Sequence, residues 1–188
     1  MEAKPSGKRT CLYNASQLDV VLDTMVQQVA GLLTGRKHIM VVGILRRGAP
    51  LAEMLHKRLA GHFGYENIPL MNVQIQRYTD DLQLRYPETL LIENPENITL
   101  NLGGISVVLV DDVMYRGHSM LRAVEYLAQK QAEEIRTVVL VDRGAAKLPV
   151  RSDIAGVRLD VAPPDIIECN VPPYEAEFKI ELFQLQAP

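Results

Sequence analysis

The sequence predicts an α/β protein with a central, mainly parallel sheet flanked by helices. Segments with the spacing of amphipathic helices alternate with short runs rich in valine and isoleucine, an order typical of βα units. One run, residues 107–110, is apolar throughout, as expected of a strand covered on both faces. It leads directly into Asp111 and Asp112 and then into a turn that contains glycine. The alternation indicates the fold class, and the paired carboxylates indicate where the chemistry lies.

The first half of the chain contains two predicted helices and two predicted strands. Ser16 is the expected N-cap of the first helix, and Gly35 is its stop signal. The apolar face of this helix consists of Leu18, Val21, Leu22, Met25, Val29 and Leu32. Residues 38–45 are then a predicted strand, residues 49–63 a helix, and residues 68–76 a strand.

The second half continues the alternation after an irregular interval. Residues 77–104 are long, polar in places and punctuated by proline, which in a compact domain indicates a functional or mobile segment. Residues 105–110 are the predicted strand before the two aspartates, and residues 135–142 are another strand. The helix between them has an apolar face made of Met120, Ala123, Val124, Leu127 and Ala128.

Composition fits one soluble domain. A chain of 188 residues can bury a substantial core, and 47% hydrophobic with 23% charged residues is ordinary for a globular protein. We find no apolar run of membrane-spanning length, and residues 1–9 lack the hydrophobic core of a signal peptide, so a cytoplasmic location is expected. The formal net charge is -3, so any RNA-binding surface would have to be a local patch of cations.

The turn after Asp112 has the features of an anion site. The first amides of a helix have no internal partners and carry the positive end of its dipole. Gly117 allows close approach of the backbone, and Ser119 adds a hydroxyl. A phosphate bound there would be repelled by two carboxylates unless a sugar with vicinal hydroxyls or a Mg²⁺ ion lay between them. The plainer alternative is that Asp111 ends the strand and Asp112 is a solvated turn residue.

The chain resembles the type I phosphoribosyltransferases, and over most of its length it is similar to the bifunctional pyrimidine-operon attenuator and uracil phosphoribosyltransferase family. Four segments carry the resemblance in the same order along the chain. They are residues 43–48 with Leu51 and Ala52, residues 77–82 with Asp80, Asp81 and Leu82, residues 111–119, and residues 140–144 followed by 148–153.

The resemblance implies a type I phosphoribosyltransferase fold in a single domain over residues 1–188. Residues 77–104 would form a flexible loop or hairpin that closes over the substrates, and residues 145–188 would supply part of a small hood and the C-terminal strands. Proline pairs at 163–164 and 172–173 mark turns in this hood. The implied reaction joins phosphoribosyl diphosphate (PRPP) and uracil into UMP and diphosphate, with Mg²⁺, in pyrimidine salvage. Members commonly self-associate, so a homodimer or homotetramer is expected.

Each motif takes a role by this resemblance. Asp111 and Asp112 would hold the ribose hydroxyls and the metal ion, and Arg47 would bind the diphosphate as the third catalytic group. The further substrate-binding candidates are Arg46 and Gly48 in the first loop, Arg77 in the lid, Tyr115, Arg116, Gly117, His118 and Ser119 in the phosphate loop, and Asp142 and Arg143 beside the base. Arg85 is a second lid cation. Arg143 would bind a base carbonyl, or Asp142 would be its structural partner.

The chain also departs from the family pattern. Residues 116–119 read Arg-Gly-His-Ser where the family usually has Thr-Gly-Arg-Thr, and Arg46 replaces a threonine. Guanidinium groups match phosphate in a bidentate fork, but they can also crowd a pocket. Two alternatives therefore stay open: an RNA-binding regulator that senses nucleotides, with cations such as Lys4, Lys8, Arg9, Arg36 and Lys37, and a PRPP-binding protein with weak turnover. Transferases of 6-oxopurines typically have an acid at the position of Tyr115, which disfavours a purine substrate.

Overall fold

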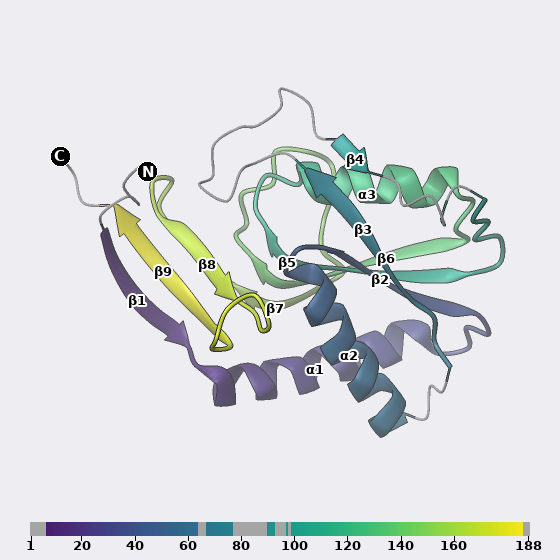
Figure 1. Cartoon of the computed structure of the whole chain (residues 1–188), viewed down its shortest axis with the longest axis horizontal. Coiled ribbons are helices and arrows are strands. Elements are labelled where there is room, and N and C mark those ends of the chain that lie inside the picture. The colour runs from purple at the N-terminus through teal and green to yellow at the C-terminus, as the bar shows by residue number, and fades with distance from the viewer. Residues whose placement is uncertain (1–6, 64–66, 77–89, 93–96, 98, 186–188) are drawn as a thin grey trace.

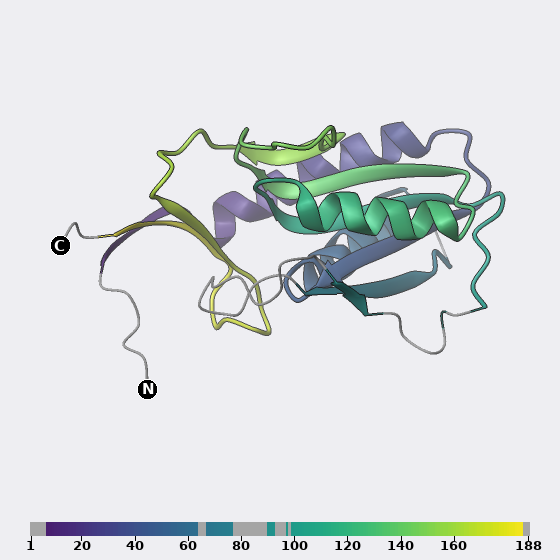
Figure 2. The same cartoon turned by 90° about the horizontal axis from the view of Figure 1, so that it is seen from above.

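The computed structural model describes residues 7–63, 67–76, 90–92, 97 and 99–185, which form two sheets with helices around the larger one (Figure 1). The main sheet has six strands in the order β4-β3-β2-β5-β6-β7, and the small sheet has the order β1-β9-β8. The small sheet lies beside one end of the main sheet in both views (Figures 1 and 2).

The elements follow the predicted alternation. The main sheet consists of β2 (Ile39–Leu45), β3 (Leu70–Gln76), β4 (Leu90–Ile92), β5 (Ser106–Met114), β6 (Glu134–Asp142) and β7 (Ile154–Arg158). The small sheet consists of β1 (Gly7–Tyr13), β8 (Ile166–Asn170) and β9 (Lys179–Leu185). The helices are α1 (Ala15–Leu33), α2 (Gly48–Phe63) and α3 (His118–Gln129). Strands β2, β3 and β6 and helix α2 begin within two residues of their predicted starts and end where predicted.

Strands β2 and β5 lie side by side at the point where the strand order reverses. They pair in parallel, with Val41 opposite Val108 and Gly43 opposite Val110. From β2 the chain proceeds through α2 to β3 on one side, and from β5 it proceeds through α3 to β6 on the other. Ligands of open α/β sheets bind in the crevice at the carboxyl ends of such a strand pair. The fold therefore directs the loops after β2 and β5 into one crevice.

Both faces of the main sheet are covered at its centre, which explains why β2 and residues 107–110 of β5 are continuously apolar. Val41, Val108 and Leu140 pack in one cluster with α1 and α2, whereas Val42 and Leu109 pack in a second cluster with α3. Figure 1 accordingly shows α3 on the opposite side of the sheet from α1 and α2. The predicted mainly parallel sheet between helices is confirmed. Among the described helices, none has the length and hydropathy needed to span a bilayer.

Helix α1 starts earlier than the sequence analysis predicts. Its N-cap is Asn14, whose side chain accepts a hydrogen bond of 3.1 Å from the Gln17 amide, while the Gln17 side chain accepts one of 3.0 Å from the Asn14 amide. These reciprocal bonds form a capping box. Ser16 instead lies within the first turn. Its prediction as N-cap is wrong because serine and asparagine are comparable caps, and only asparagine here has glutamine three residues later.

The small sheet combines the two ends of the described chain. Residues 145–188 contribute β8 and β9 to it, but they also contribute β7 to the edge of the main sheet. Strand β1, which the sequence analysis did not predict, pairs antiparallel with β9. Arg9 of β1 forms a bidentate ion pair with Glu168 of β8, at 2.8 and 3.1 Å. Arg9, one of the cations considered for RNA binding, therefore has a carboxylate partner within the small sheet.

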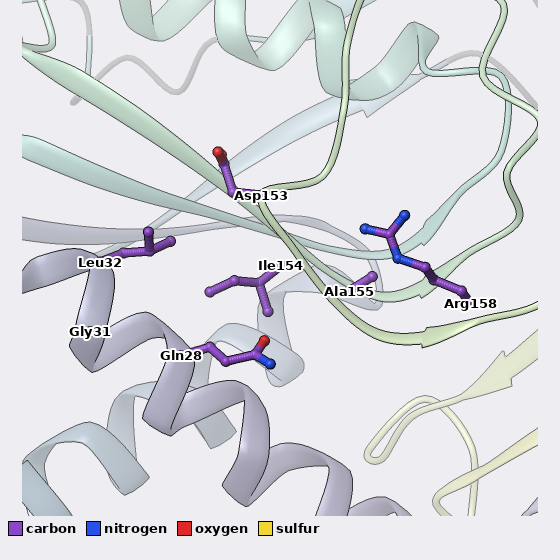
Figure 3. Close-up of a pocket in the computed structure, with 7 residues that line it drawn as sticks. All are labelled: Gln28, Gly31, Leu32, Asp153, Ile154, Ala155 and Arg158. Atoms are coloured by element: carbon purple, nitrogen blue, oxygen red, sulfur yellow. The ribbon is translucent and has the colours of Figure 1, made fainter.

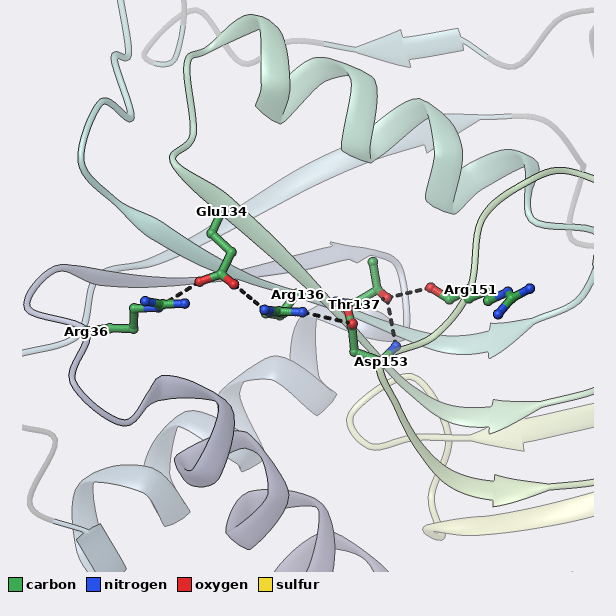
Figure 4. A network of polar contacts seen from close by, with 6 residues as sticks. All are labelled: Arg36, Glu134, Arg136, Thr137, Arg151 and Asp153. Atoms are coloured by element: carbon green, nitrogen blue, oxygen red, sulfur yellow. Dashed lines mark hydrogen bonds and ion pairs between the residues drawn. The ribbon is translucent and has the colours of Figure 1, made fainter.

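A polar network connects the start of β6 with the segment before β7 (Figure 4). Glu134 accepts from Arg36 at 2.7 Å and also from Arg136, whose guanidinium reaches Asp153 at 3.3 Å. Asp153 in turn accepts from the amide of Thr137 at 2.7 Å and from its hydroxyl at 3.1 Å. The network lies at the end of β6 opposite to the crevice. It stabilises the sheet edge and engages Arg36, a second cation considered for RNA.

We expect Asn14→Ala to lower the free energy of unfolding by about 1 kcal/mol, because the first amides of α1 lose an acceptor. Ser16→Ala, two residues along the same turn, should change it by less than about 0.5 kcal/mol. Urea unfolding followed by circular dichroism measures both. Equal losses in the two variants would contradict the assignment of the cap.

Candidate active site

The loop after β2 is held directly against β5. Only Arg46 and Arg47 separate the end of β2 from the start of α2 at Gly48, and the peptide bond between Leu45 and Arg46 is cis. A Cβ atom on Gly48 would lie 2.7 Å from the carbonyl oxygen of Val110 and 3.0 Å from the Cα of Asp111. No side chain fits in that space. Gly48 therefore sets the close approach between the loop of two arginines and the strand of two aspartates.

Asp111 and Asp112 lie inside β5, which continues to Met114. The predicted strand end at Val110 is therefore wrong; the paired β6 strand keeps residues 111–114 in register, and the connection to α3 is correspondingly short. Asp111 Oδ1 accepts a hydrogen bond of 2.9 Å from the Asp112 amide. Both side chains are partly buried.

The two carboxyls have raised pKa values for related reasons. Burial raises the pKa of Asp111 well above its ordinary value, and the neighbouring charge of Asp112 adds to the effect. Burial also raises the pKa of Asp112, although the Arg47 guanidinium opposes the shift. The crevice therefore holds two carboxyl groups that favour a cationic or hydrogen-bond-donating ligand.

The turn before α3 starts the helix with a glycine. Gly117 is the N-cap with φ of 84°, and as a glycine it has no side chain with which to cap the first amides. His118 is the first residue of the helix and Ser119 the second, both partly buried. A Cβ on Gly117 would also lie 2.6 Å from a methyl group of Val150. Glycine is thus required here for left-handed backbone and for packing, beyond the ligand approach that the sequence analysis assigned to it.

Tyr115 and Arg143 contact each other just after the carboxyl ends of β5 and β6. The guanidinium of Arg143 lies 4.3 Å from the centroid of the Tyr115 ring, and its Nη2 donates to the Asp165 carbonyl at 2.9 Å. Arg143 is only 8% exposed, and its buried Nε has no hydrogen-bond partner among the described residues. Burial lowers the pKa of Arg143. Arg116, by contrast, is exposed, 5.2 Å from the Tyr115 ring centroid.

Asp142 has internal partners on both carboxylate oxygens. Its Oδ1 accepts from the Gly144 amide at 2.9 Å, and its Oδ2 accepts from the Ser152 hydroxyl at 2.7 Å. These contacts fix the turn after β6. Neither these contacts nor those of Arg143 join the two side chains, so they do not support the alternative in which Asp142 is the structural partner of Arg143.

A carboxylate that no sequence signal indicated reaches Arg47 from the C-terminal part of the chain. Glu175, in the turn between β8 and β9, accepts from Arg47 Nε at 3.0 Å and from Arg47 Nη2 at 2.5 Å. The neighbouring Tyr174 ring lies 5.1 Å from the Arg46 guanidinium. The Pro172-Pro173 pair marked a turn here, but nothing in the sequence indicates which loop that turn contacts.

Other predicted positions do not join the site in the described part of the chain. Arg77, Arg85 and the Asp80-Asp81 pair lie outside the described residues, so their lid role stays a prediction. A cavity of about 450 Å³ opens between α1 and β7, lined by Gln28 and Arg158 among others (Figure 3). None of the described site residues predicted from the sequence lines that cavity.

The two carboxylates of the site suit Mg²⁺ better than a metal ion that needs all of its ligands from protein side chains. Within the described residues no group of three or more histidine, cysteine, aspartate or glutamate side chains gathers around one point. Mg²⁺ typically uses one or two carboxylates and completes its shell with water and substrate phosphates. Asp111 and Asp112 supply hard oxygen ligands of that kind beside an anion-binding loop.

Comparisons with known proteins agree with this geometry. The phosphoribosyl transferase domain family matches residues 12–177. The bifunctional protein PyrR of Haemophilus ducreyi is 34% identical over 146 residues, covering 77% of this chain and 80% of that protein. The PyrR of Actinobacillus pleuropneumoniae is 30% identical over 176 residues, covering 92% and 96%. A hypoxanthine phosphoribosyltransferase structure from Trypanosoma cruzi has a TM-score of 0.70 at 14% identity, covering 99% and 94%, a likeness of fold.

We expect Asp111→Asn to stabilise the folded protein at neutral pH by about 1 kcal/mol, the usual size of a single side-chain effect. The folded pKa of Asp111 is raised, so wild type loses stability as pH rises through that pKa, whereas the asparagine variant does not. The difference should therefore shrink as pH falls toward about 4, the ordinary pKa of aspartate.

Urea unfolding of both proteins between pH 4 and pH 8 measures this difference. Asp19→Asn, at an exposed aspartate that pairs with Arg58, is the matched control and should change stability by less than about 0.5 kcal/mol. A constant difference between wild type and Asp111→Asn across the pH range would contradict the assignment.

Proposed function

The chain belongs to the phosphoribosyltransferase family, and on that premise we propose that it transfers the phosphoribosyl group of PRPP to N1 of uracil, releasing diphosphate. The observation that carries the proposal is the close approach of Gly48 to Asp111. It brings the loop with two arginines against the two carboxylates of β5, and β5 itself leads through the glycine turn to the start of α3. These three parts match the diphosphate, ribose and 5′-phosphate of a single PRPP molecule.

Each part then has a distinct task. Asp111 and Asp112 accept hydrogen bonds from the ribose hydroxyls. Residues 115–119 bind the 5′-phosphate through the amides at the start of α3. Arg47 and the backbone at Gly48 bind the diphosphate, with Arg46 beside them.

Mg²⁺ would be held by Asp111 and Asp112 together with substrate oxygens, and it would supply charge neutralisation for the leaving diphosphate. No side chain is needed as a covalent nucleophile. The protein contributes positioning and electrostatic stabilisation as the bond at the anomeric carbon breaks and positive charge develops on the sugar ring. The lid role of Arg77 is part of this proposal, because water must be excluded from that carbon.

Arg143 is the proposed base-recognition residue. Its unpartnered, buried Nε is a donor suited to a carbonyl oxygen, and the Tyr115 ring keeps the guanidinium plane in place. Tyr115 also occupies the position where 6-oxopurine transferases typically have an acid, so a general base is absent at this one position. Carbonyl recognition without an acid at position 115 favours uracil over a purine. Asp142 contributes indirectly, through the turn that it fixes after β6.

A second function is favoured by the name of the relatives, bifunctional protein PyrR. We propose that the chain also has a pyrimidine-operon regulatory role in which RNA binding responds to nucleotide in the crevice. Arg9 and Arg36 are engaged by Glu168 and Glu134, so they are weaker candidates for phosphate contacts than the sequence alone indicates. A cytoplasmic location and a homodimeric or homotetrameric state belong to the same proposal.

We expect the purified protein to form UMP from uracil and PRPP with Mg²⁺, and the double variant Asp111→Asn with Asp112→Asn to lose activity at least about 100-fold, because the ribose contacts are made best by carboxylates. A panel of uracil, hypoxanthine, guanine, xanthine and orotate, read by chromatography of the nucleotide product, measures it. Tight PRPP binding by wild type with no product from any base would instead support the weak-turnover alternative.

We expect Arg143→Lys to lower kcat/KM for uracil by roughly tenfold or more, while the affinity for PRPP stays within about twofold, because lysine keeps the charge but loses the planar donor and the ring contact. Initial rates at varied uracil, with PRPP affinity from calorimetry, separate the two quantities. Lys147→Arg, at an exposed position in the following loop, serves as the control. Parallel losses for both substrates would exclude a base-specific role.

A further inference from the structure

The contact between Arg47 and Glu175 places an internal carboxylate on the cation that the proposed function assigns to diphosphate. Two donor atoms of Arg47 converge on one oxygen, Glu175 Oε1, at 3.0 and 2.5 Å. The other oxygen, Oε2, accepts from the Val171 amide at 2.8 Å. The carboxylate is therefore fixed by its own turn on one side and by Arg47 on the other.

The same turn also covers the neighbouring arginine. Tyr174 lies 5.1 Å from the Arg46 guanidinium, measured to the ring centroid. Two successive residues of the hood thus face two successive residues of the first loop. Because Tyr174 faces Arg46 and Glu175 faces Arg47, the two contacts together form one interface between the turn and the first loop.

The charges favour an ionised contact. Burial raises the pKa of Glu175 more than any other single contribution, but the hydrogen bonds from Arg47 and from the Val171 amide, together with the positive charges of Arg47 and Arg46, outweigh it and hold the pKa below its ordinary value. The Glu175 side chain is 22% exposed, so water screens the pair only in part. At neutral pH Arg47 therefore carries a bound anion supplied by the chain itself.

Glu175 also lines a cavity formed by residues around the turn between β8 and β9. This cavity, of about 300 Å³, is lined by Glu175, Glu177, Lys179 and Glu181, among others. Within it Lys179 contacts Glu177 and Glu181, each at 3.2 Å. Glu175 thus pairs with Arg47 and also lines this cavity, which gives its side chain space to move when a ligand anion binds Arg47.

We propose that Glu175 is an internal competitor that occupies the diphosphate position on Arg47 and sets the affinity of the crevice for PRPP and for diphosphate. The proposal rests on the proposed function, because it needs Arg47 to bind that group. A diphosphate cannot share Arg47 with a carboxylate without repulsion, so PRPP has to displace Glu175. When diphosphate is the product, the return of Glu175 to Arg47 favours its release.

The test is calorimetric binding of PRPP and of inorganic diphosphate, each with Mg²⁺, to wild type and to Glu175→Gln. Glutamine keeps the length of the side chain and an acceptor for the Val171 amide, but it removes the charge. We expect both ligands to bind roughly tenfold more tightly to this variant, about the effect of one charge-assisted hydrogen bond that the ligand no longer has to break. Glu177→Gln is the matched control, because Glu177 lies in the same turn, is 73% exposed and contacts Lys179 instead of Arg47. It should leave both affinities within about twofold of wild type.

Equal or weaker binding of both ligands by Glu175→Gln would overturn the competitor role and indicate that Glu175 only positions Arg47. Absence of PRPP binding in wild type and in both variants would overturn the proposed function itself, and the competitor role with it. Circular dichroism and thermal unfolding check that the variants are folded. If Glu175→Gln does not fold, Glu175→Asp, which keeps the charge but draws it back from Arg47, should give a smaller gain in affinity; no gain would count against the proposal.

Discussion

The close packing of Gly48 against Asp111 is the constraint on which the crevice depends. Strands β2 and β5 are hydrogen-bonded neighbours, so the loops that follow them must separate or interlock at their shared end. The loop after β2 packs directly against β5 because Gly48 has no side chain. A Cβ atom at this position would lie only 3.0 Å from the Cα of Asp111. Arg47 is thereby fixed close enough to oppose the rise in the pKa of Asp112. Any larger residue at position 48 would move cations away from carboxylates and divide the site.

Several charged groups of the crevice are only partly balanced by partners within the protein. Burial and mutual repulsion raise the pKa of Asp111, while Arg143 keeps a buried donor without a partner among the described residues. Such arrangements cost stability in the protein alone and are typical of sites completed by a ligand. Arg47 and Asp142 differ, because Glu175 already pairs with Arg47 and the turn after β6 occupies both carboxylate oxygens of Asp142. The site therefore combines groups that await a ligand with one group whose partner has to be displaced.

Much of the fold could be predicted from the sequence, and the errors have local causes. Continuous apolar strands and amphipathic helices give strong periodic signals, so the alternation and the parallel sheet were predictable from residues such as Val41 and Val42. Polar residues weaken the signal at the ends of elements. Two aspartates therefore masked the continuation of β5, and Ser16 competed with Asn14 as a cap. Strand β1 is exposed over most of its length and lacks an apolar face that would reveal it.

The sequence by itself determined the motifs of the site: the paired aspartates, the glycine turn into α3 and the loop of two arginines, together with their membership of a known family. These are local patterns, readable because each is short and chemically specific. Only the tertiary structure decided which of these groups already have partners. Glu175 is 128 residues from Arg47 in the chain, and Asp165 is 22 residues from Arg143. Contacts over such separations depend on how the hood packs against the sheet, a property of the whole fold that no local pattern records.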